Sequence, residues 1–434
     1  MSQPPLPSAT QTPARPPLIS LDDALARLMQ AVRPFDAAQA LQVSTFDALG
    51  RVLAAEVRSA VDVPPADNSA MDGYALRCAD VASAGTTLPV SQRIPAGLVG
   101  APLLPGTAAR IFTGAQVPLG ADAVVMQEQC VAVSDATAGG AVRIDTVPRP
   151  GLSIRRRGED VRAGSVVLPA GARLTPQALG LAASAGAATL AVARRPRVAL
   201  FSTGDELVMP GEVAPEQMKP GAIYNSNRYT LRALIQALGC ECTDLGIVPD
   251  RLDATREALR RAALNHDLIV TSGGVSVGEE DHIKPAVEAE GRLDLWQMSM
   301  KPGKPLAFGV VRRSADSPEQ DQAYFIGLPG NPVSSFVTFF LVVRPVLLHL
   351  QGVVDWQLRP TPMRADFDWP RADKRREFLR VRRNATGGLD LFPSQGSGVL
   401  TSVVWGDGVV DNPSGQAIHT GDTVNYLPFS ELLS

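Results

Sequence analysis

The sequence has few of the residues that mark several large classes of proteins. Its 434 residues include four cysteines, too few for a disulfide framework, and no two of them form a CxxC pair. Four histidines are present, none in a metal-binding spacing such as HExxH. Walker A and GxGxxG motifs are also missing. The composition therefore excludes a disulfide-rich scaffold, and the motifs give no sign of a P-loop enzyme or a Rossmann dehydrogenase.

An excess of one charge and long apolar runs are also lacking. The 41 basic and 44 acidic residues give a net charge of −3, which argues against a protein that coats nucleic acid by bulk charge. No apolar run approaches the roughly 18 residues of a membrane span, and residues 1–17 lack the basic start and apolar core of a secretion signal. The length is typical of about three domains. We expect a cytoplasmic, multi-domain enzyme without a nucleic-acid or membrane partner.

The N-terminal part of the chain divides into a tail and two helical segments. Residues 1–17 hold six prolines among polar residues and are expected to form a disordered tail. Apolar residues then recur at helical spacing behind Ser20, a good N-cap. Thr175 caps a second predicted helix, which opens with a proline. We expect the second helix to pack against the first, so that residues 18–57 and 161–195 form one discontinuous domain.

Two segments are expected to be mostly β-structure. Residues 58–160 contain short runs of β-forming residues separated by glycine and proline turns, and residues 348–434 have the same texture. Between them, residues 196–347 alternate predicted strands with predicted helices, one of which has Asp253 as its expected N-cap. This alternation predicts a parallel sheet covered by helices on both faces. The predicted fold class is α/β plus mostly β domains, with a central three-layer α/β domain and a small C-terminal β domain.

Glycine-bearing loops follow three of the strands predicted for the central domain. They are STGDE (202–206), SGGVSVGEED (272–281) and GLPGNP (327–332). Ligands of open α/β sheets bind at the carboxyl ends of the strands, and the N–H groups of glycine turns bind anions. Ser272, Gly273 and Gly274 are therefore candidates for holding a phosphate-bearing ligand. Each loop taken alone has an alternative interpretation as an ordinary strand-to-helix turn.

Three carboxylates follow strands of the same predicted sheet. Glu206, Asp250 and Asp281 would repel a phosphate unless a divalent cation lay between them, and Mg²⁺ is held by one or two carboxylates together with phosphate oxygens. The alternative is that they are solvated surface acids, and for Asp250 the two interpretations have equal weight. We expect Glu206 and Asp281 to be the metal ligands.

Lysines are rare, and two of them lie close together. Only five of the 41 basic residues are lysines, yet Lys301 and Lys304 both fall within the segment MKPGKP, which continues to Pro305. A compact ammonium differs from a guanidinium in the anions it suits. A rigid loop with two lysines fits a tetrahedral dianion, although chance clustering among five lysines remains an alternative.

Other polar segments carry weaker signals. The loop DNSAMDGYA (67–75) is dense in polar groups and has an alternative interpretation as a set of Asx-turns. Thr113 follows a predicted strand. The segment RRRGED (155–160) is more consistent with an interdomain connection than with an anion site. Near the C-terminus, Arg380 and Ser397 offer another cation and another hydroxyl. His266 and His282 are expected to be structural.

Seven of these segments stand in the order and spacing of one known family. The sequence resembles the MoeA-type molybdopterin molybdenumtransferases, the molybdenum insertases of molybdenum cofactor synthesis, which are related to the E domains of gephyrin. The resemblance covers residues 18–434 and rests on the following motifs: DNSAMDGYA (67–75), FTGA (112–115), RRRGED (155–160), FSTGDEL (201–207), SGGVSVGEED (272–281), MKPGKP (300–305) and GLPGNPVS (327–334).

The resemblance implies a fold and a reaction. It implies a four-domain homodimer whose central domain has the fold of the molybdopterin adenylyltransferases. It also implies that adenylylated molybdopterin and molybdate, both substrates, give molybdenum cofactor and AMP with Mg²⁺ as cofactor. Molybdopterin adenylyltransferase and the apoenzymes that accept the cofactor are implied as further partners.

The resemblance also implies roles for individual residues. Asp72, Asp281 and Lys301 are the expected catalytic positions, and Thr113 and Asp72 reach the cleft from the β domain of a partner subunit. Glu206, Asp250 and Asp281 match the nucleotide and metal site. The positions associated with molybdate are Lys301, Lys304, Arg380 and Ser397. One departure is Gln297, which stands where some bacterial relatives have a lysine.

Two other functions are compatible with parts of the sequence. The preceding adenylyl transfer uses the same central fold, but it needs neither the N-terminal 195 residues nor the C-terminal β domain. A non-catalytic scaffold resembling gephyrin is the second alternative. A scaffold would be free to lose the acids and cations that this sequence retains.

Overall fold

The computed structural model describes residues 18–133, 140–274, 282–314 and 321–432, except the side chains of Leu295 and Trp296. The contacts divide the chain into two compact units. One contains residues 193–434 together with 1–40 and 50–52, and the other contains residues 41–49 and 53–192.

A seven-stranded mixed sheet forms the centre of the first unit. In spatial order its strands are β1 (Leu18–Ile19), β19 (Gly291–Met298), β21 (Pro305–Arg312), β22 (Gln322–Leu328), β18 (Leu268–Ser272), β14 (Arg197–Thr203) and β17 (Glu241–Val248). β22, β18, β14 and β17 pair in parallel, as the alternation of strands and helices predicts. β21 is antiparallel to both of its neighbours, and neither β21 nor β19 was predicted from the sequence.

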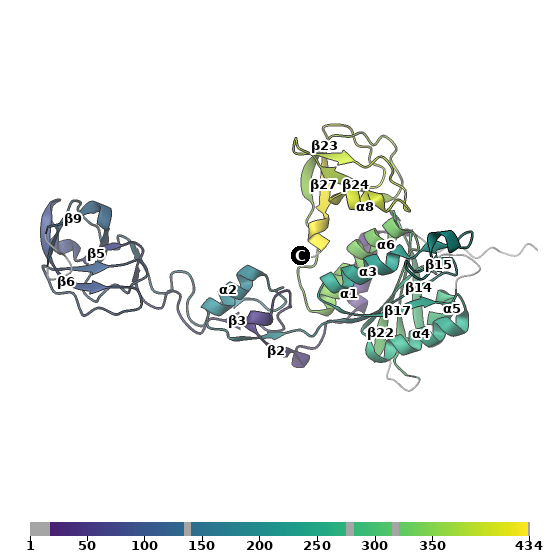
Figure 1. The fold of residues 1–434 in the computed structure, drawn as a ribbon, viewed down its shortest axis with the longest axis horizontal. Helices are drawn as coiled ribbons and strands as arrows, with labels where there is room; N and C mark the ends of the chain where they lie inside the picture. The colour runs from purple at the N-terminus through teal and green to yellow at the C-terminus, as the bar shows by residue number, and fades with distance from the viewer. Residues whose placement is uncertain (1–17, 134–139, 275–281, 315–320, 433–434) are drawn as a thin grey trace, which may run out of the picture. The chain divides into compact units, whose positions relative to one another are not determined.

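Helices cover both faces of this sheet, which confirms the predicted three-layer arrangement (Figure 1). The helices α4 (Leu252–Asn265) and α5 (Ile283–Glu290) pack on one face. The other face is covered by α1 (Leu21–Ala31), α3 (Ser226–Ala237) and the helical run Pro332–Leu350, whose parts are α6 (Pro332–Thr338), a π-helical turn and α7 (Arg344–Leu350). All five residues of β18 are buried, as expected for a strand covered on both faces.

Two local helix signals in the sequence are confirmed and one is wrong. The hydroxyl of Ser20 accepts a hydrogen bond from the N–H of Asp23, and that of Thr175 accepts from Ala178, so both residues are N-caps. Asp253 is not a cap. Helix α4 begins at Leu252, two residues earlier than an N-cap at Asp253 requires, and Arg251 is at the cap position. Asp253 pairs with Arg251 from the first turn, where acidic residues are favourable.

Helix α1 corrects another expectation. Its buried residues, Leu21, Ala24 and Leu28, belong to the core beneath the central sheet and do not pack against residues 161–195. The second predicted helix, α2 (Pro176–Ser184), packs in the other unit, against a core formed with residues 43–57. The amphipathic pattern thus identified the helix correctly but could not show which domain its apolar face enters.

The C-terminal β structure is a six-stranded sheet that includes a short strand from the central domain. β20 (Met300–Lys301) lies between β19 and β21 in the chain and pairs in parallel with β24, so that Lys301 is the partner of Glu377. The other strands are β23 (Thr361–Ala365), β24 (Arg376–Arg383), β25 (Gly388–Leu391), β26 (Gly408–Asn412) and β27 (Thr423–Pro428). This pairing attaches the lysine loop directly to the C-terminal sheet.

The second unit is largely β-structure, as predicted for residues 58–160. Its main sheet has the order β8 (Ala123–Met126), β5 (Gly73–Leu76), β7 (Ala108–Ile111), β6 (Thr86–Ile94), β10 (Ala141–Ile144) and β9 (Cys130–Ala132). Shorter pairs join β2 (Leu41–Ser44) to β13 (Thr189–Val192), β3 (Val57–Arg58) to β12 (Val166–Leu168), and β4 (Asn68–Ser69) to β11 (Ile154–Arg155). In the RRRGED segment, Arg156 pairs with Asp67 and Arg157 with Asp62, so both ion pairs join residues of the same unit and do not test the interdomain role expected for the segment.

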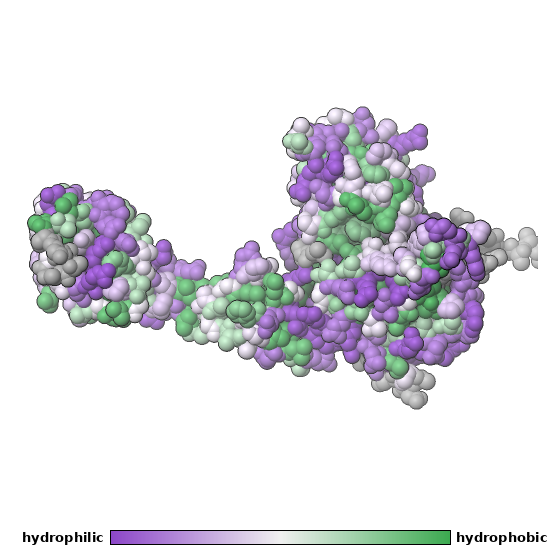
Figure 2. Space-filling model, viewed as in Figure 1, coloured by the Kyte–Doolittle hydropathy of each residue, from purple (hydrophilic) through white to green (hydrophobic). Residues whose placement is uncertain are grey.

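The helical run Pro332–Leu350 is long and apolar enough to cross a membrane by length and composition. The expectation that no apolar run approaches this length is therefore wrong. Since 89% of the run's most apolar 18-residue window is buried inside the fold, its apolar side chains belong to the core. The face of the molecule shown in Figure 2 carries hydrophilic side chains interspersed with smaller hydrophobic patches.

Candidate active site

One cavity of about 620 Å³ lies in the first unit, at the carboxyl ends of the parallel strands. Loops following β14, β17, β18 and β22 line it, as the position of ligands in open α/β sheets predicts. The lysine loop after β20 and two segments of the C-terminal sheet complete the wall. The polar or charged residues of the lining are Thr203, Glu206, Asp250, Lys301, Lys304, Asn331, Ser334, Arg375, Gln395 and Ser397.

The glycine loop after β18 is held close to its neighbours. Gly273 has a φ of +91°, and a Cβ there would lie 2.7 Å from the carbonyl oxygen of Thr203, so that only glycine fits without a backbone shift. The buried Asn227 side chain, from the first turn of α3, donates hydrogen bonds to Ser272 Oγ at 3.3 Å and to the carbonyl of Gly330 at 2.7 Å. Ser272 is itself buried and holds the loop, while Gly273 and Gly274 face the cavity.

Three cations face the cavity. Lys301, Lys304 and Pro305, the first residue of β21, all line it, so the structure brings together the residues of the predicted lysine loop. Arg375 is the third cation, and no sequence motif predicted it. Lys301 Nζ lies 3.2 Å from Glu377 Oε1 and 3.6 Å from Asp373 Oδ2. Within the described part of the chain, no carboxylate lies within 4 Å of the Lys304 ammonium.

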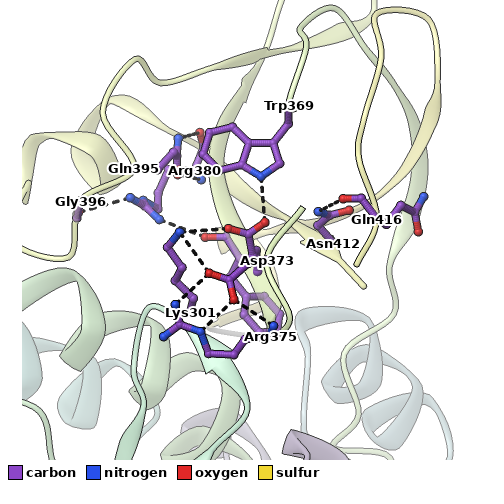
Figure 3. Close-up of polar contacts among 11 residues, drawn as sticks. Lys301, Trp369, Asp373, Arg375, Arg380, Gln395, Gly396, Asn412 and Gln416 are labelled. Carbon is purple, nitrogen blue, oxygen red and sulfur yellow. Dashed lines mark hydrogen bonds and ion pairs between the residues drawn. The ribbon is translucent and has the colours of Figure 1, made fainter. Parts of the chain in front are cut away.

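Arg375 and Asp373 form a tight pair beside Lys301 (Figure 3). Asp373 accepts hydrogen bonds from the Arg375 backbone at 3.0 Å and from its guanidinium at 2.8 and 3.0 Å. The Arg375 guanidinium, with a smaller contribution from Lys301, holds the pKa of Asp373 well below its usual range. The pKa of Arg375 is raised by the same bond. Both side chains therefore remain charged at neutral pH.

Two carboxylates share the cavity with these cations. Glu206 follows β14 and Asp250 follows β17, and the two loops are linked by a 3.4 Å hydrogen bond from the Asp250 N–H to Asp205. Asp281, the third acid of the prediction, lies outside the described residues. Across the described ranges no three acidic, histidine or cysteine side chains gather as a complete metal cage. Two carboxylates still suit Mg²⁺, which takes much of its coordination from water and substrate phosphate.

Arg380 does not line the cavity, although Ser397 does. The Arg380 side chain is 1% exposed, and its guanidinium donates to the carbonyls of Gly396 and Phe378 and to Ser402 Oγ. Burial lowers its pKa to about 10, so it keeps its charge at neutral pH. No carboxylate of the described chain lies within ion-pair distance of it. Arg380 thus places an uncompensated positive charge behind the Gln395–Ser397 loop, and β24 directs its side chain into the core.

The loop that carries Ser397 is fixed from both domains. The Gln395 side chain exchanges hydrogen bonds with the backbone of Arg380, at 2.8 and 3.1 Å. The carbonyl of Ser397 accepts a 3.0 Å hydrogen bond from the N–H of Val333, in the first turn of α6. The C-terminal domain therefore closes one side of the cavity, over the helix N-terminus that begins at Asn331.

Asp72 and Thr113 lie together in the second unit. The backbone N–H and the hydroxyl of Thr113 each donate a 2.7 Å hydrogen bond to Asp72 Oδ1. These bonds, the backbone one first, lower the pKa of Asp72 below its usual value. Asp72 follows an irregular segment before β5, and Thr113 follows the adjacent strand β7. Thr113 therefore fixes the orientation of the Asp72 carboxylate through contacts that lie within the second unit alone.

The comparisons with known proteins agree with this architecture along the chain. Residues 19–186 match the MoeA N-terminal region, described as domains I and II. Residues 199–349 match a probable molybdopterin binding domain, and residues 362–429 match the MoeA C-terminal region, described as domain IV.

Relatives match over nearly their whole length. A molybdopterin molybdenumtransferase from Haemophilus influenzae is 38% identical over 424 residues, covering 96% of this chain and all of that protein. One from Nostoc is 36% identical, with 96% of both chains covered. A solved structure of the molybdopterin biosynthesis protein MoeA from Pyrococcus horikoshii is similar with a TM-score of 0.72 and 30% identity, covering 95% of this chain and 99% of that one. The chain belongs to the MoeA family of molybdopterin molybdenumtransferases.

Proposed function

We propose that this protein inserts molybdenum from molybdate into adenylylated molybdopterin and releases AMP. The observation that carries the proposal is the single cavity where three cations, two carboxylates and the glycine loops meet. Its glycine loops and helix N-terminus suit a phosphate-bearing ligand. The family and the names of the relatives give molybdenum and molybdopterin as the transferred element and its acceptor.

The chemistry of the substrates explains the charges. Molybdate is a dianion, and it must approach a ligand that carries a diphosphate and a dithiolene. Two unit charges 4 Å apart repel by about 4 kcal/mol at an effective dielectric constant of 20. Lys301, Lys304 and Arg375 offset this repulsion by their position on the cavity wall, and the charge of Arg380 adds to theirs from behind the loop. Ser397 offers a hydroxyl to a molybdate oxygen.

The reaction balances without a covalent enzyme intermediate. The two sulfurs of the molybdopterin dithiol bind molybdenum and give up their two protons, with which one molybdate oxygen leaves as water. A second water molecule then cleaves the phosphoanhydride to release AMP. The side chains bind and orient the two anions and offset their charge. Hydrolysis of the anhydride makes release of the product irreversible.

The acidic residues present fit a magnesium ion. Glu206 and Asp250 share the cavity, and Asp281 is the further candidate ligand from the sequence. Bound there with phosphate oxygens, Mg²⁺ would neutralise the diphosphate and polarise the phosphoryl group. Among the described acids, Asp250 shares the cavity with Glu206, and Glu206 and Asp281 remain the proposed metal ligands.

The remaining assignments rest on the family resemblance. We assign Asp72, positioned by Thr113, to the same reaction as a carboxylate supplied by the β-rich unit. We further propose a cytoplasmic homodimer that receives its substrate from a molybdopterin adenylyltransferase and delivers cofactor to apoenzymes.

The direct test is incubation with adenylylated molybdopterin, Mg²⁺ and molybdate, with AMP followed over time. We expect AMP to appear in proportion to molybdate and to stop when Mg²⁺ is chelated. Consumption of ATP with molybdopterin would instead identify the preceding adenylyl transfer. Absence of both reactions would favour a scaffold.

A further inference from the structure

A buried carboxylate lies behind the Lys301 ammonium and does not line the cavity. The side chain of Glu377 is 1% exposed. Its Oε1 lies 3.2 Å from Lys301 Nζ, and its Oε2 accepts a 2.8 Å hydrogen bond from Trp369 Nε1. Neither the sequence motifs nor the proposed function assigns Glu377 a role. A buried carboxylate is stable only where both oxygens find partners, and here both do.

The backbone fixes where this carboxylate meets the lysine. Lys301 and Glu377 are register partners in the parallel pair of β20 and β24. The other oxygen is held by Trp369, whose backbone exchanges hydrogen bonds with Ile418 at 2.7 and 3.0 Å. The position of the Glu377 carboxylate is thus set by the C-terminal sheet, while Lys301 belongs to the loop of the central domain.

The Lys301 ammonium needs a fixed carboxylate partner if it is to stay in one position beside the cavity. The side chain of Lys301 is 39% exposed and has four rotatable carbon–carbon bonds, so it would sample many rotamers in solvent. Glu377 and the more distant Asp373 hold the ammonium from the side away from the cavity. We propose that Glu377 is a positioning residue, which acts through Lys301 to set the molybdate site. This inference rests on the proposed function of that site.

Electrostatics alone predicts the opposite effect of removing this charge. A carboxylate behind an anion site repels the anion, so neutralising Glu377 would lower the molybdate requirement if only charge mattered. If Glu377 positions Lys301, its loss scatters the ammonium and raises the requirement. The sign of the change therefore separates the two roles.

The variant that tests this is Glu377→Gln. A glutamine has nearly the same size but only one acceptor oxygen, so it cannot accept from both Lys301 and Trp369. We expect the molybdate concentration for half-maximal AMP release to rise about tenfold, with the half-saturating concentration of adenylylated molybdopterin changed less than twofold. Trp369→Phe, which removes the donor that anchors Glu377, should give a smaller rise of about threefold.

A matched control and a double variant complete the experiment. Glu290→Gln removes another ion-paired carboxylate, which bonds Arg256 and Arg260 away from the cavity, and should leave the molybdate requirement unchanged. In a Lys301→Ala background, Glu377→Gln should have less than a twofold further effect, because the group that it positions is gone.

The outcomes separate this inference from the function on which it rests. If Lys301→Ala leaves the molybdate requirement unchanged, the proposed anion site itself is wrong. If Lys301→Ala raises it but Glu377→Gln leaves it unchanged or lowers it, the positioning role alone is refuted. A full, additive effect of Glu377→Gln in the Lys301→Ala background would also refute it, because the effect would then come from elsewhere in the fold.

Discussion

Thr113 donates two hydrogen bonds, one from its backbone N–H and one from its hydroxyl, to the same oxygen of Asp72, each at 2.7 Å. Both bonds stabilise the ionised form, so the pKa of Asp72 lies below its usual value. The carboxylate is oriented before any substrate arrives. The role proposed for Asp72 in the reaction therefore predicts a signature in the pH dependence.

We predict that Thr113→Val shifts the acid limb of the pH profile of AMP release to higher pH. Valine keeps the backbone donor but removes the hydroxyl, so the pKa of Asp72 rises towards its ordinary value and the carboxylate is protonated earlier as the pH falls. Thr113→Ser, which keeps the hydroxyl, should retain the wild-type profile. An identical profile for Thr113→Val would show that ionised Asp72 does not limit the reaction.

Lys304 carries a second prediction. No described carboxylate balances its ammonium, which lines the cavity, so its charge is available to an anion that binds there. Lys304→Ala should raise the half-saturating molybdate concentration at least tenfold, and added salt should weaken molybdate binding less in this variant than in the wild type. The control is Lys284→Ala, an exposed lysine on α5 outside the cavity, which should behave as wild type.

Gly303 tests the geometry of the lysine loop. Its φ is +104°, and a Cβ there would lie 2.5 Å from Thr338 Oγ1. Gly303→Ala therefore adds backbone strain of roughly 1–3 kcal/mol and displaces the lysines on both sides. Chemical denaturation should show the lost stability, and the molybdate requirement should rise. Adding Thr338→Ala removes the contact between the new Cβ and Thr338 Oγ1 but leaves the backbone strain. The double variant should therefore recover part of the lost stability and part of the wild-type molybdate requirement. No change in either quantity for Gly303→Ala would contradict the loop geometry described above.

Arg380 is predicted to hold the Gln395–Ser397 loop. Its guanidinium donates hydrogen bonds to three neutral acceptors on different segments. Arg380→Lys keeps the positive charge, but the lysine side chain is shorter and its ammonium lacks the planar guanidinium geometry, so it cannot reach all three acceptors. Hydrogen exchange should accelerate at the N–H of Val333, which donates to the Ser397 carbonyl, and molybdate binding should weaken. Weaker binding with unchanged exchange would instead mean that Arg380 acts by charge alone.

The sequence predicts those parts of the site that depend on local order. Each glycine loop follows its own strand, so their meeting at the sheet edge follows from the alternation of strands and helices, and Gly273 and Asn331 both line the cavity. Helix α1 was predicted from its periodicity, but not the domain that its apolar face enters, because an apolar stripe shows only that a partner exists.

The missed residues depend on long-range pairing. Arg375 and Glu377 reach the lysine loop only because β20 leaves the central domain and joins β24, and a two-residue strand leaves no periodic pattern. Arg380 was identified as a cation, but its burial depends on how β24 packs. For a single residue in a strand, the sequence alone does not show whether its side chain lines the cavity or is buried in the core behind the lining.

The central claim is that molybdate binds between the lysine loop and the Ser397 loop. The most direct measurement is the anomalous X-ray signal of molybdenum in crystals soaked with molybdate and AMP. The account predicts a molybdenum peak in the cavity beside Lys301, Lys304 and Ser397, which weakens in Lys304→Ala crystals. A peak of equal strength in that variant, or molybdenum bound only outside the cavity, would contradict it.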